Sequence, residues 1–294
     1  MRVSRYFADA FPYLDLNLGP GSLAAYLGCE PKFSYDTVWY EPCAETIAEL
    51  QEKDFMRFSP WWEEHLREVR ETVRLSEGEF PVGIPDVQEN IDILAAMRGA
   101  QNLCYDLMDE PETVKTVLSR LEGAADYCYD EMYRAVALAD GSSVFTAFAI
   151  WGSGRTAKVQ CDFSAMISPG AYREFVLPGL MRECARLDHS LYHLDGPGAL
   201  VHADAVLSIP SLQALQWTSG AGQNDGGSEE WFPLYDKVMD AGKSLWIQIY
   251  EGEPYVWLER AKKIVRRYGT RGIYFVFAPC SVEDAAELAR GLKV

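Results

Sequence analysis

Short apolar runs alternate with longer amphipathic stretches from Phe80 to the end of the chain. The apolar runs have the length of buried strands, and they predict strands at 80–85, 144–150, 158–161, 190–193, 214–217, 244–249 and 272–277. The stretches between them predict helices at 91–97, 101–109, 112–138, 169–187, 199–207, 229–241, 254–268 and 282–292. This alternation indicates an α/β fold with a mostly parallel sheet, and the number of units favours a closed (β/α)8 TIM barrel.

The beginning of the chain has a different pattern. Residues 1–78 show no such alternation and are predicted to form loops and short helices rich in aromatic residues, among them Trp39, Tyr40, Trp61 and Trp62. A chain of 294 residues is long enough for one large domain or two small ones. We therefore predict an N-terminal helical and loop head at 1–78 that packs on a barrel at 79–294.

Composition limits the partners and the compartment. A formal net charge of −17 argues against nucleic acid and anionic membranes as partners. No apolar run approaches the roughly 20 residues of a membrane span, and the N-terminus lacks the basic and apolar regions of a signal peptide. The seven cysteines include no C-x-x-C pair, which suits a reducing compartment. We expect a cytoplasmic protein that acts on a small molecule.

Polar and aromatic residues stand at nearly every predicted strand end. The carboxyl ends of parallel strands share one edge of the sheet, where α/β proteins place their chemistry. Each of these residues alone could be a helix cap or a turn residue, but together they predict an acidic, aromatic-lined pocket. The predicted substrate-binding residues are Asp86, Trp151, Tyr192, Gln216, Trp217 and Glu251.

The stretch His193-Leu194-Asp195 is the most informative of these strand ends. Side chains alternate along a strand, so His193 and Asp195 point the same way from the end of the strand at 190–193. A histidine and a carboxylate placed like this can hold a metal ion or act as a general acid and base. The alternative is structural: His193 bonds a neighbouring backbone group and Asp195 caps the next helix.

Three sequence passages resemble the uroporphyrinogen decarboxylase superfamily. Leu94-x-x-Met97-Arg98-Gly99 and Asp106-Leu107-Met108-Asp109-x-Pro111-Glu112 are similar to its "LRG…DLxDxPE" passage, and the segment 167–178 is similar to its "LSPxxFREFVLP" passage. The resemblance covers roughly residues 85–292. It implies a (β/α)8 barrel, with either the decarboxylase activity or the transfer of methyl groups between corrinoid proteins and thiols.

The methyltransferase branch of this superfamily fits better than the decarboxylase. The decarboxylase substrate has eight carboxylates, and the head offers only Arg2, Arg5 and Arg57 before Arg67 to pair with them. The methyltransferases resemble this chain at His193, where their zinc site reads His-x-Cys, with a second cysteine after the last strand. The resemblance thus implies a divalent metal, zinc as in those methyltransferases, held by His193, Asp195 and Cys280.

Aspartate at position 195 departs from the family's cysteine. An oxygen ligand leaves a metal more Lewis-acidic and a bound thiolate less nucleophilic, so a hydroxyl or water could be activated in place of a thiol, or the metal could be lost. Asp162, which follows the strand at 158–161, is the third predicted catalytic residue with His193 and Asp195. Asp162 and Cys161, at the end of this other strand, are also the reserve ligands for the metal ion.

The sequence thus predicts a methyltransferase-like enzyme with a zinc site. The chain lacks the D-x-H-x-x-G segment that binds cobalamin, so the corrinoid would be carried by a partner protein. The protein could form a homodimer. Two alternatives stay open: a carbohydrate-active barrel that uses a carboxylate pair such as Asp162 and Glu251, and a barrel that only binds a small molecule.

Overall fold

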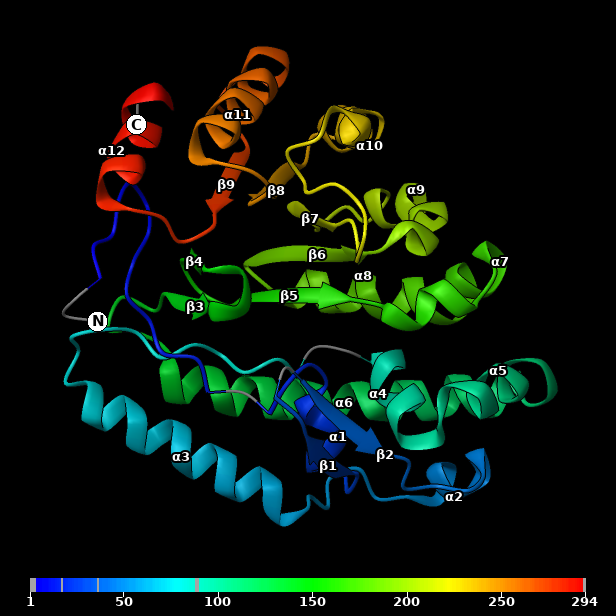
Figure 1. Ribbon diagram of the computed structural model, residues 1–294. Helices are drawn as coiled ribbons and strands as arrows, with labels where there is room; N and C mark the ends of the chain where they lie inside the picture. The colour runs from blue at the N-terminus through cyan, green and yellow to red at the C-terminus, as the bar shows by residue number, and fades with distance from the viewer. Residues whose placement is uncertain (1–3, 17, 36, 88–89, 293–294) are drawn as a thin grey trace. The chain divides into compact units, whose positions relative to one another are not determined.

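The computed structural model describes residues 4–16, 18–35, 37–87 and 90–292 (Figure 1). The chain forms two compact units. One is Tyr13–Ser190, and the other combines Leu191–Val294 with Met1–Pro12. None of the described helices has the length and apolar character needed to cross a membrane.

Five of the predicted strands form one parallel sheet. Its order follows the chain: β5 (Thr156–Gln160), β6 (His189–Asp195), β7 (Ala214–Thr218), β8 (Ser244–Ile249) and β9 (Ile273–Phe277). In the second unit, β8 is paired along its length, with Leu245 opposite Ile273 and Ile249 opposite Phe277. Leu245, Ile247 and Ile249 are all buried, as expected for strands with helices on their faces. The predicted α/β class is confirmed.

The prediction of a single strand at 144–150 was wrong. This segment is an antiparallel hairpin of β3 (Ser143–Phe145) and β4 (Ile150–Gly152). A turn of 3-10 helix, Thr146–Phe148, reverses the chain, and Ala149 adopts a left-handed conformation with φ of 48°. The composition is typical of a strand, but the apolar residues of this segment pack against one another across a turn.

The segment 80–85 was also predicted as a strand. Its backbone bonds a different segment on each side, but it does not form a regular strand. Gly83 N donates to Leu14 O at 3.0 Å, and Ile84 N donates to Val144 O at 2.8 Å. Val82 forms an isolated parallel bridge with Leu14. The described residues thus include five parallel strands and this bridging segment, and the closed eight-stranded barrel stays a prediction.

The helices predicted after the sheet begins are present close to their expected positions. In the Leu191–Val294 unit they are α9 (Ala203–Leu207), α10 (Phe232–Asp240), α11 (Pro254–Tyr268) and α12 (Val282–Leu292), with 3-10 turns before α9 and α10. Helix α11 buries Trp257, Leu258, Ala261 and Ile264, the spacing of one helix face. These apolar faces are the reason that the periodicity predicted them correctly.

In the Tyr13–Ser190 unit the helices expected from the sequence are α4 (Asn90–Arg98), α5 (Ala100–Asp109), α6 (Pro111–Val136) and the pair α7 (Pro169–Ala171) and α8 (Leu177–Arg186). Arg98 of α4 pairs with Asp106 of α5 at 2.7 Å, with both side chains mostly buried. This pair lies within the passage that resembles the superfamily, so the passage has a structural role here. Between α7 and α8, Tyr172–Val176 forms a π-helical turn.

The beginning of the chain contains more regular structure than the expected loops and short helices. It forms α1 (Ser22–Tyr26), the hairpin of β1 (Glu30–Phe33) and β2 (Val38–Glu41), α2 (Ile47–Glu52) and the 17-residue helix α3 (Pro60–Ser76). Helix α3 packs along α6 (Figure 1). Phe58 stacks on Tyr127 of α6 with ring centroids 5.4 Å apart, and Trp62 contacts both rings. Of the aromatic residues noted in the sequence, Trp62 therefore packs α3 against α6.

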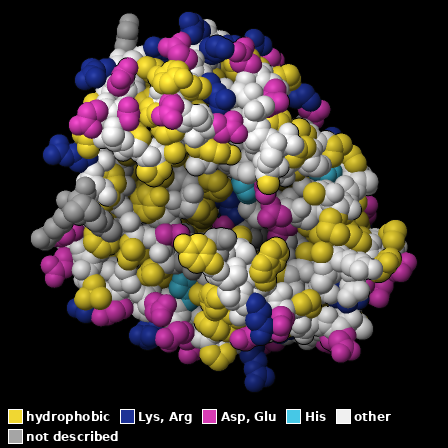
Figure 2. All heavy atoms as spheres, in the orientation of Figure 1, with side chains coloured by type: hydrophobic (Ala, Val, Ile, Leu, Met, Phe, Trp, Pro, Cys, Tyr) yellow, Lys and Arg dark blue, Asp and Glu magenta, His cyan; other side chains and the backbone are white. Residues whose placement is uncertain are grey.

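Charged side chains of both signs are interspersed on the face shown in Figure 2. Several of the protein's charged groups form ion pairs within the fold. On α8, Arg182 pairs with Asp126 of α6 at 2.6 Å, and Arg186 pairs with the same carboxylate at 2.9 Å. Two guanidinium groups on one carboxylate hold α8 against α6, so part of the large negative charge is neutralised within the fold.

We predict that Ser59→Ala lowers the free energy of unfolding by about 1 kcal/mol. Ser59 is the N-cap of α3, where its hydroxyl accepts from Trp61 N at 3.3 Å and donates to Ala25 O at 2.6 Å. Urea unfolding of the variant checks this. Ser228→Ala is the matched control, because Ser228 also occupies an N-cap position but makes no side-chain capping bond. Equal destabilisation by the two changes would contradict the prediction.

Candidate functional site

The carboxyl end of β6 carries His193, which is oriented by its neighbour in the sheet. His193 lies opposite Gln216 of β7, and the ring Nδ1 bonds the Gln216 side-chain oxygen. Gln216 is buried, and its Nε2 donates to Thr218 Oγ1 at 2.8 Å. Because the amide oxygen of Gln216 faces the ring and can only accept, Nδ1 is the donor of this hydrogen bond. A bond of this kind holds histidine in the tautomer that binds a metal or accepts a proton.

Asp195 is the last residue of β6 and is exposed. It lies opposite Thr218, two residues along the strand from the His193 and Gln216 pair. The backbone is fixed directly after it, because Gly196 N donates to Thr218 O at 2.8 Å with Gly196 at φ of 75°. Gly196, rather than Asp195, is the N-cap of the following 3-10 helix. The purely structural interpretation of Asp195 as a helix cap is therefore not what the structure shows.

In the Tyr13–Ser190 unit, β5 carries a chain of polar contacts that links two predicted site residues. Lys158, only 2% exposed, pairs with Asp86 at 2.5 Å and donates to Gln160 Oε1 at 2.6 Å. Gln160 Nε2 in turn donates to Asp162 Oδ2 at 2.9 Å. Lys158 and Gln160 lie on one face of the strand, so their side chains connect Asp86 to Asp162. The result is a buried ammonium connected to an exposed carboxylate.

Asp92 of α4 fixes the backbone after β5. Its carboxylate accepts from Asp162 N at 2.8 Å and from Phe163 N at 2.9 Å, at the start of the 3-10 helix Asp162–Met166. Cys161 is buried, and burial raises the pKa of its thiol well above the ordinary value. A thiol in this state is a poor ligand until it loses its proton. Of the two reserve ligands at this strand end, Asp162 is the better one.

Three described residues could each offer one ligand atom to a metal ion: Asp162 in the Tyr13–Ser190 unit, and His193 and Asp195 in the Leu191–Val294 unit. These are the three residues that the sequence predicted to be catalytic. Cys280 does not belong to this group of described residues. It follows β9 on an exposed loop, and burial, with Asp284 nearby, raises the pKa of its thiol.

The residues predicted to bind substrate differ in their exposure. Tyr192 and Trp217 are buried, and each points to the face of its strand opposite to its neighbour, His193 or Gln216. Trp217 packs edge-on against Trp231 with ring centroids 5.1 Å apart. Trp151 on β4, by contrast, is 48% exposed.

Glu251, also predicted at the substrate end, is held by a residue that the sequence interpretation missed. Asp225 lies in the glycine-rich loop after β7, with its side chain fully buried, and its Oδ2 accepts from Tyr250 N and Glu251 N at 2.7 Å each. Its Oδ1 accepts from Arg260 at 2.6 Å and from Gly227 N at 2.9 Å. The sequence signal that could have identified Asp225 was a single aspartate in a glycine-rich segment. Gly226 is needed beside it, because a Cβ there would lie 2.9 Å from Gln248 O.

Comparison with known proteins identifies a fold and no family. No family model matches the chain, and no curated protein matches it in sequence. Among solved structures, a methyltransferase from Methanosarcina mazei is similar, with a TM-score of 0.60 and 12% sequence identity over 92% of this chain and 77% of the other. At this identity the likeness establishes a methyltransferase-like fold.

Proposed function

We propose that this protein is a metal-dependent methyltransferase of the uroporphyrinogen decarboxylase superfamily. It would move a methyl group between a small molecule or thiol and a corrinoid carried by a partner protein. The observation that carries the proposal is the orientation of His193 by Gln216 at a strand end that also presents Asp195. The methyltransferase-like fold supports it. The proposal includes a (β/α)8 barrel at 79–294 with a head at 1–78.

The donor set fits a divalent metal. Imidazole nitrogen and carboxylate oxygen are both zinc ligands, and Gln216 supplies the hydrogen bond to the other ring nitrogen that metal-bound histidines usually make. We assign His193 and Asp195 as ligands, with Asp162 as a third and Cys280 as the soft ligand suggested by the sequence. A bound divalent ion would supply Lewis acidity, which favours the deprotonated form of an acceptor thiol or hydroxyl.

The remaining polar residues orient the substrate and move protons. Asp162 is joined through Gln160 to Lys158, whose ammonium is held by Asp86. This chain of hydrogen bonds orients the Asp162 carboxylate, which could accept a proton from the acceptor group. We assign Asp86, Trp151, Tyr192, Gln216, Trp217 and Glu251 to the surroundings of the substrate, with exposed aromatic and acidic groups suited to a methoxylated or cationic small molecule.

The test is the metal content of the purified protein. We expect about one zinc per chain in wild type grown with zinc, and well below that in His193→Ala and Asp195→Ala. The matched control is His189→Ala, at the opposite end of the same strand, where the ring bonds Ser153 Oγ at 3.1 Å. Elemental analysis of all four proteins, prepared without chelator, gives the answer.

A wild type with little metal, and no gain on addition of Zn²⁺ or Co²⁺, would contradict the proposal. His193 and Asp195 would then act as an acid and base pair, and turnover of a chromogenic glycoside would identify a carbohydrate-active enzyme. Loss of metal in His189→Ala as well would show that the variants act through folding. Retention of metal in His193→Ala with a lower rate of methyl transfer would place the histidine outside the ligand set.

A further inference from the structure

A pair of cysteines lies outside the proposed active site, at the open end of the hairpin of β1 and β2. Glu30 is paired with Glu41 at the last register position, so Cys29 directly precedes the hairpin and Cys43 follows it by two residues. Their sulfur atoms are 3.4 Å apart, and the Cys29 thiol donates to Cys43 Sγ. Residues 14 positions apart in sequence are thus held in contact by the strand pairing.

The backbone around both cysteines is fixed. Cys29 N donates to Ala24 O at 2.9 Å, and Cys43 N donates to Met97 O at 2.9 Å. The two thiols differ in their access to solvent, because Cys29 is 1% exposed whereas Cys43 is exposed. A small reagent can therefore reach Cys43 first, with Cys29 already in place behind it.

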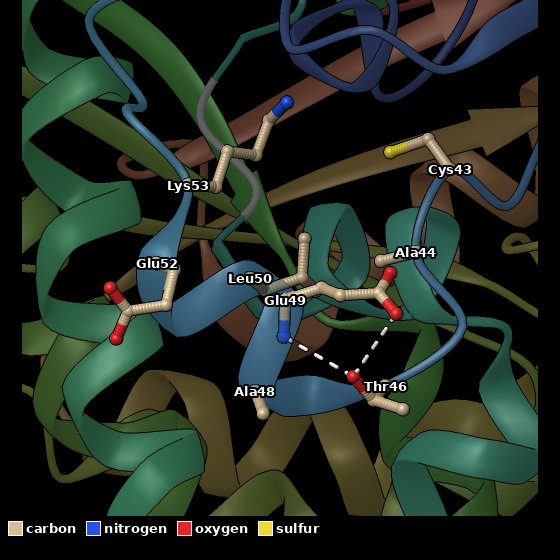
Figure 3. Close-up of a pocket in the computed structure, with 8 residues that line it drawn as sticks. All are labelled: Cys43, Ala44, Thr46, Ala48, Glu49, Leu50, Glu52 and Lys53. Carbon is tan, nitrogen blue, oxygen red and sulfur yellow. Dashed lines mark hydrogen bonds between the residues drawn. The ribbon is translucent and has the colours of Figure 1, made fainter.

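Cys43 also lines an open pocket of about 540 Å³ that includes Lys53 and the helix α2 (Figure 3). Figure 3 draws Cys43 and Lys53 among the residues that line this space, and Lys53 is a positive group whose charge acts on the Cys43 sulfur. The hydrogen bond from Cys29, followed by Lys53, lowers the pKa of Cys43 to about 7. Near neutral pH a large part of Cys43 is therefore thiolate, the reactive form.

We propose that Cys43 and Cys29 form a peroxide-reactive dithiol, in which Cys43 is the attacking cysteine and Cys29 the resolving cysteine. The Cys43 thiolate attacks a hydroperoxide oxygen; the S–O bond forms, the O–O bond breaks, and the leaving oxygen takes a proton to become water or an alcohol. The Cys29 sulfur then attacks the Cys43 sulfur, an S–S bond forms, and hydroxide leaves with the Cys29 proton as water. Two thiols are oxidised and one peroxide is reduced.

The other exposed thiol provides the comparison. Cys280 is exposed like Cys43, but burial and Asp284 raise its pKa, and it has no cysteine in hydrogen-bond contact among the described residues. We expect Cys43 to be alkylated by iodoacetamide near neutral pH roughly tenfold faster than Cys280. Lys53→Met should slow the reaction at Cys43 and leave Cys280 unchanged. Peptide mass spectrometry reads both sites in one sample.

Peroxide treatment of the full chain tests the disulfide. Wild type and Cys280→Ser should give a linked peptide containing Cys29 and Cys43, and Cys43→Ser should not. In Cys29→Ala the reaction should stop at a sulfenic acid on Cys43, which dimedone traps. Because Cys29 is buried, circular dichroism must show that the Cys29→Ala variant is folded. If this variant does not fold, the alkylation rates of Cys43 and Cys280 in wild type test the proposal instead. Equal rates at Cys43 and Cys280, or peroxide-treated wild type with both thiols still free, would overturn the proposal.

Discussion

Asp225→Ala should lower the free energy of unfolding by roughly 3–5 kcal/mol, because it breaks a buried ion pair and removes the acceptor of three backbone N–H groups. The Asp225 side chain is fully buried and pairs with Arg260 at 2.6 Å. Without it, the ion pair that remains for Arg260 among the described residues is the longer contact of 3.4 Å with Glu251. The variant should also loosen the turn at Tyr250 and Glu251, whose N–H groups Asp225 accepts.

Urea unfolding measures the loss of stability, and limited proteolysis after residue 250 measures the loosened turn. Asp236→Ala is the matched control in the same unit. Asp236 also pairs with an arginine at 2.6 Å, but its side chain is 39% exposed and that of Arg267 47%. An exposed pair contributes about 1 kcal/mol or less, so the control should be nearly as stable as wild type. A similar small effect at Asp225 would show that water replaces its contacts.

The strands that could be predicted from the sequence are those whose apolar residues pack only against neighbouring strands and helices. The run at 244–249 matches β8 in both bounds, because Leu245, Trp246, Ile247 and Ile249 are all buried and no turn interrupts the pattern. The run at 144–150 has a similar composition, but a turn at 146–149 folds it on itself. A turn without glycine or proline leaves no signal in the sequence, and it is the left-handed Ala149 that accommodates the reversal.

The helix predicted at 169–187 shows a second limit. Its N-cap and Pro169 were read correctly, since Ser168 Oγ accepts from Ala171 N at 3.2 Å. The π-helical turn at Tyr172–Val176 was not expected. Pro178 follows it and lacks the N–H that a regular helix would use there, so a wider turn before the proline accommodates the missing donor.

The candidate site could be predicted only as far as local geometry determines it. Alternation along one strand places His193 and Asp195 together, and that requires no knowledge of distant residues. Lys158 and Asp225 were missed because their roles depend on partners far away in the chain, Asp86 in one case and Arg260 in the other. A lysine inside an apolar strand is unusual, and that is the signal that could have identified Lys158.

We expect wild type to lose stability as the pH rises, and we expect Glu183→Gln to abolish most of this pH dependence. Glu183 lies on α8, is 1% exposed, and neither carboxylate oxygen has a hydrogen-bond partner among the described residues. Burial raises the pKa of this carboxyl from 4.5 to about 8, against the opposing effect of Arg182, with Glu122 and Asp126 adding to the rise. Near neutral pH the folded protein therefore keeps Glu183 protonated, whereas the unfolded chain has it ionised.

The sign of the effect follows from proton binding. A group whose pKa is higher in the folded state stabilises it fully below the unfolded pKa, and that stability is lost as the pH rises from 4.5 to about 8. The loss from this one group amounts to as much as roughly 5 kcal/mol. Glutamine has the same shape and no charge, so wild type and Glu183→Gln should be similarly stable near pH 4.5 and differ increasingly up to about pH 8.

Urea unfolding of both proteins across this range gives the difference directly, because the contributions of the other acidic groups cancel. Glu110→Gln, at an exposed position before α6, is the control and should follow wild type at every pH. Parallel curves for wild type and Glu183→Gln would mean that Glu183 is ionised in the folded state. In that case Arg182, which already pairs with Glu122 and Asp126, would have to neutralise a third carboxylate as well, and Arg182→Met would then destabilise the fold more than Glu183→Gln.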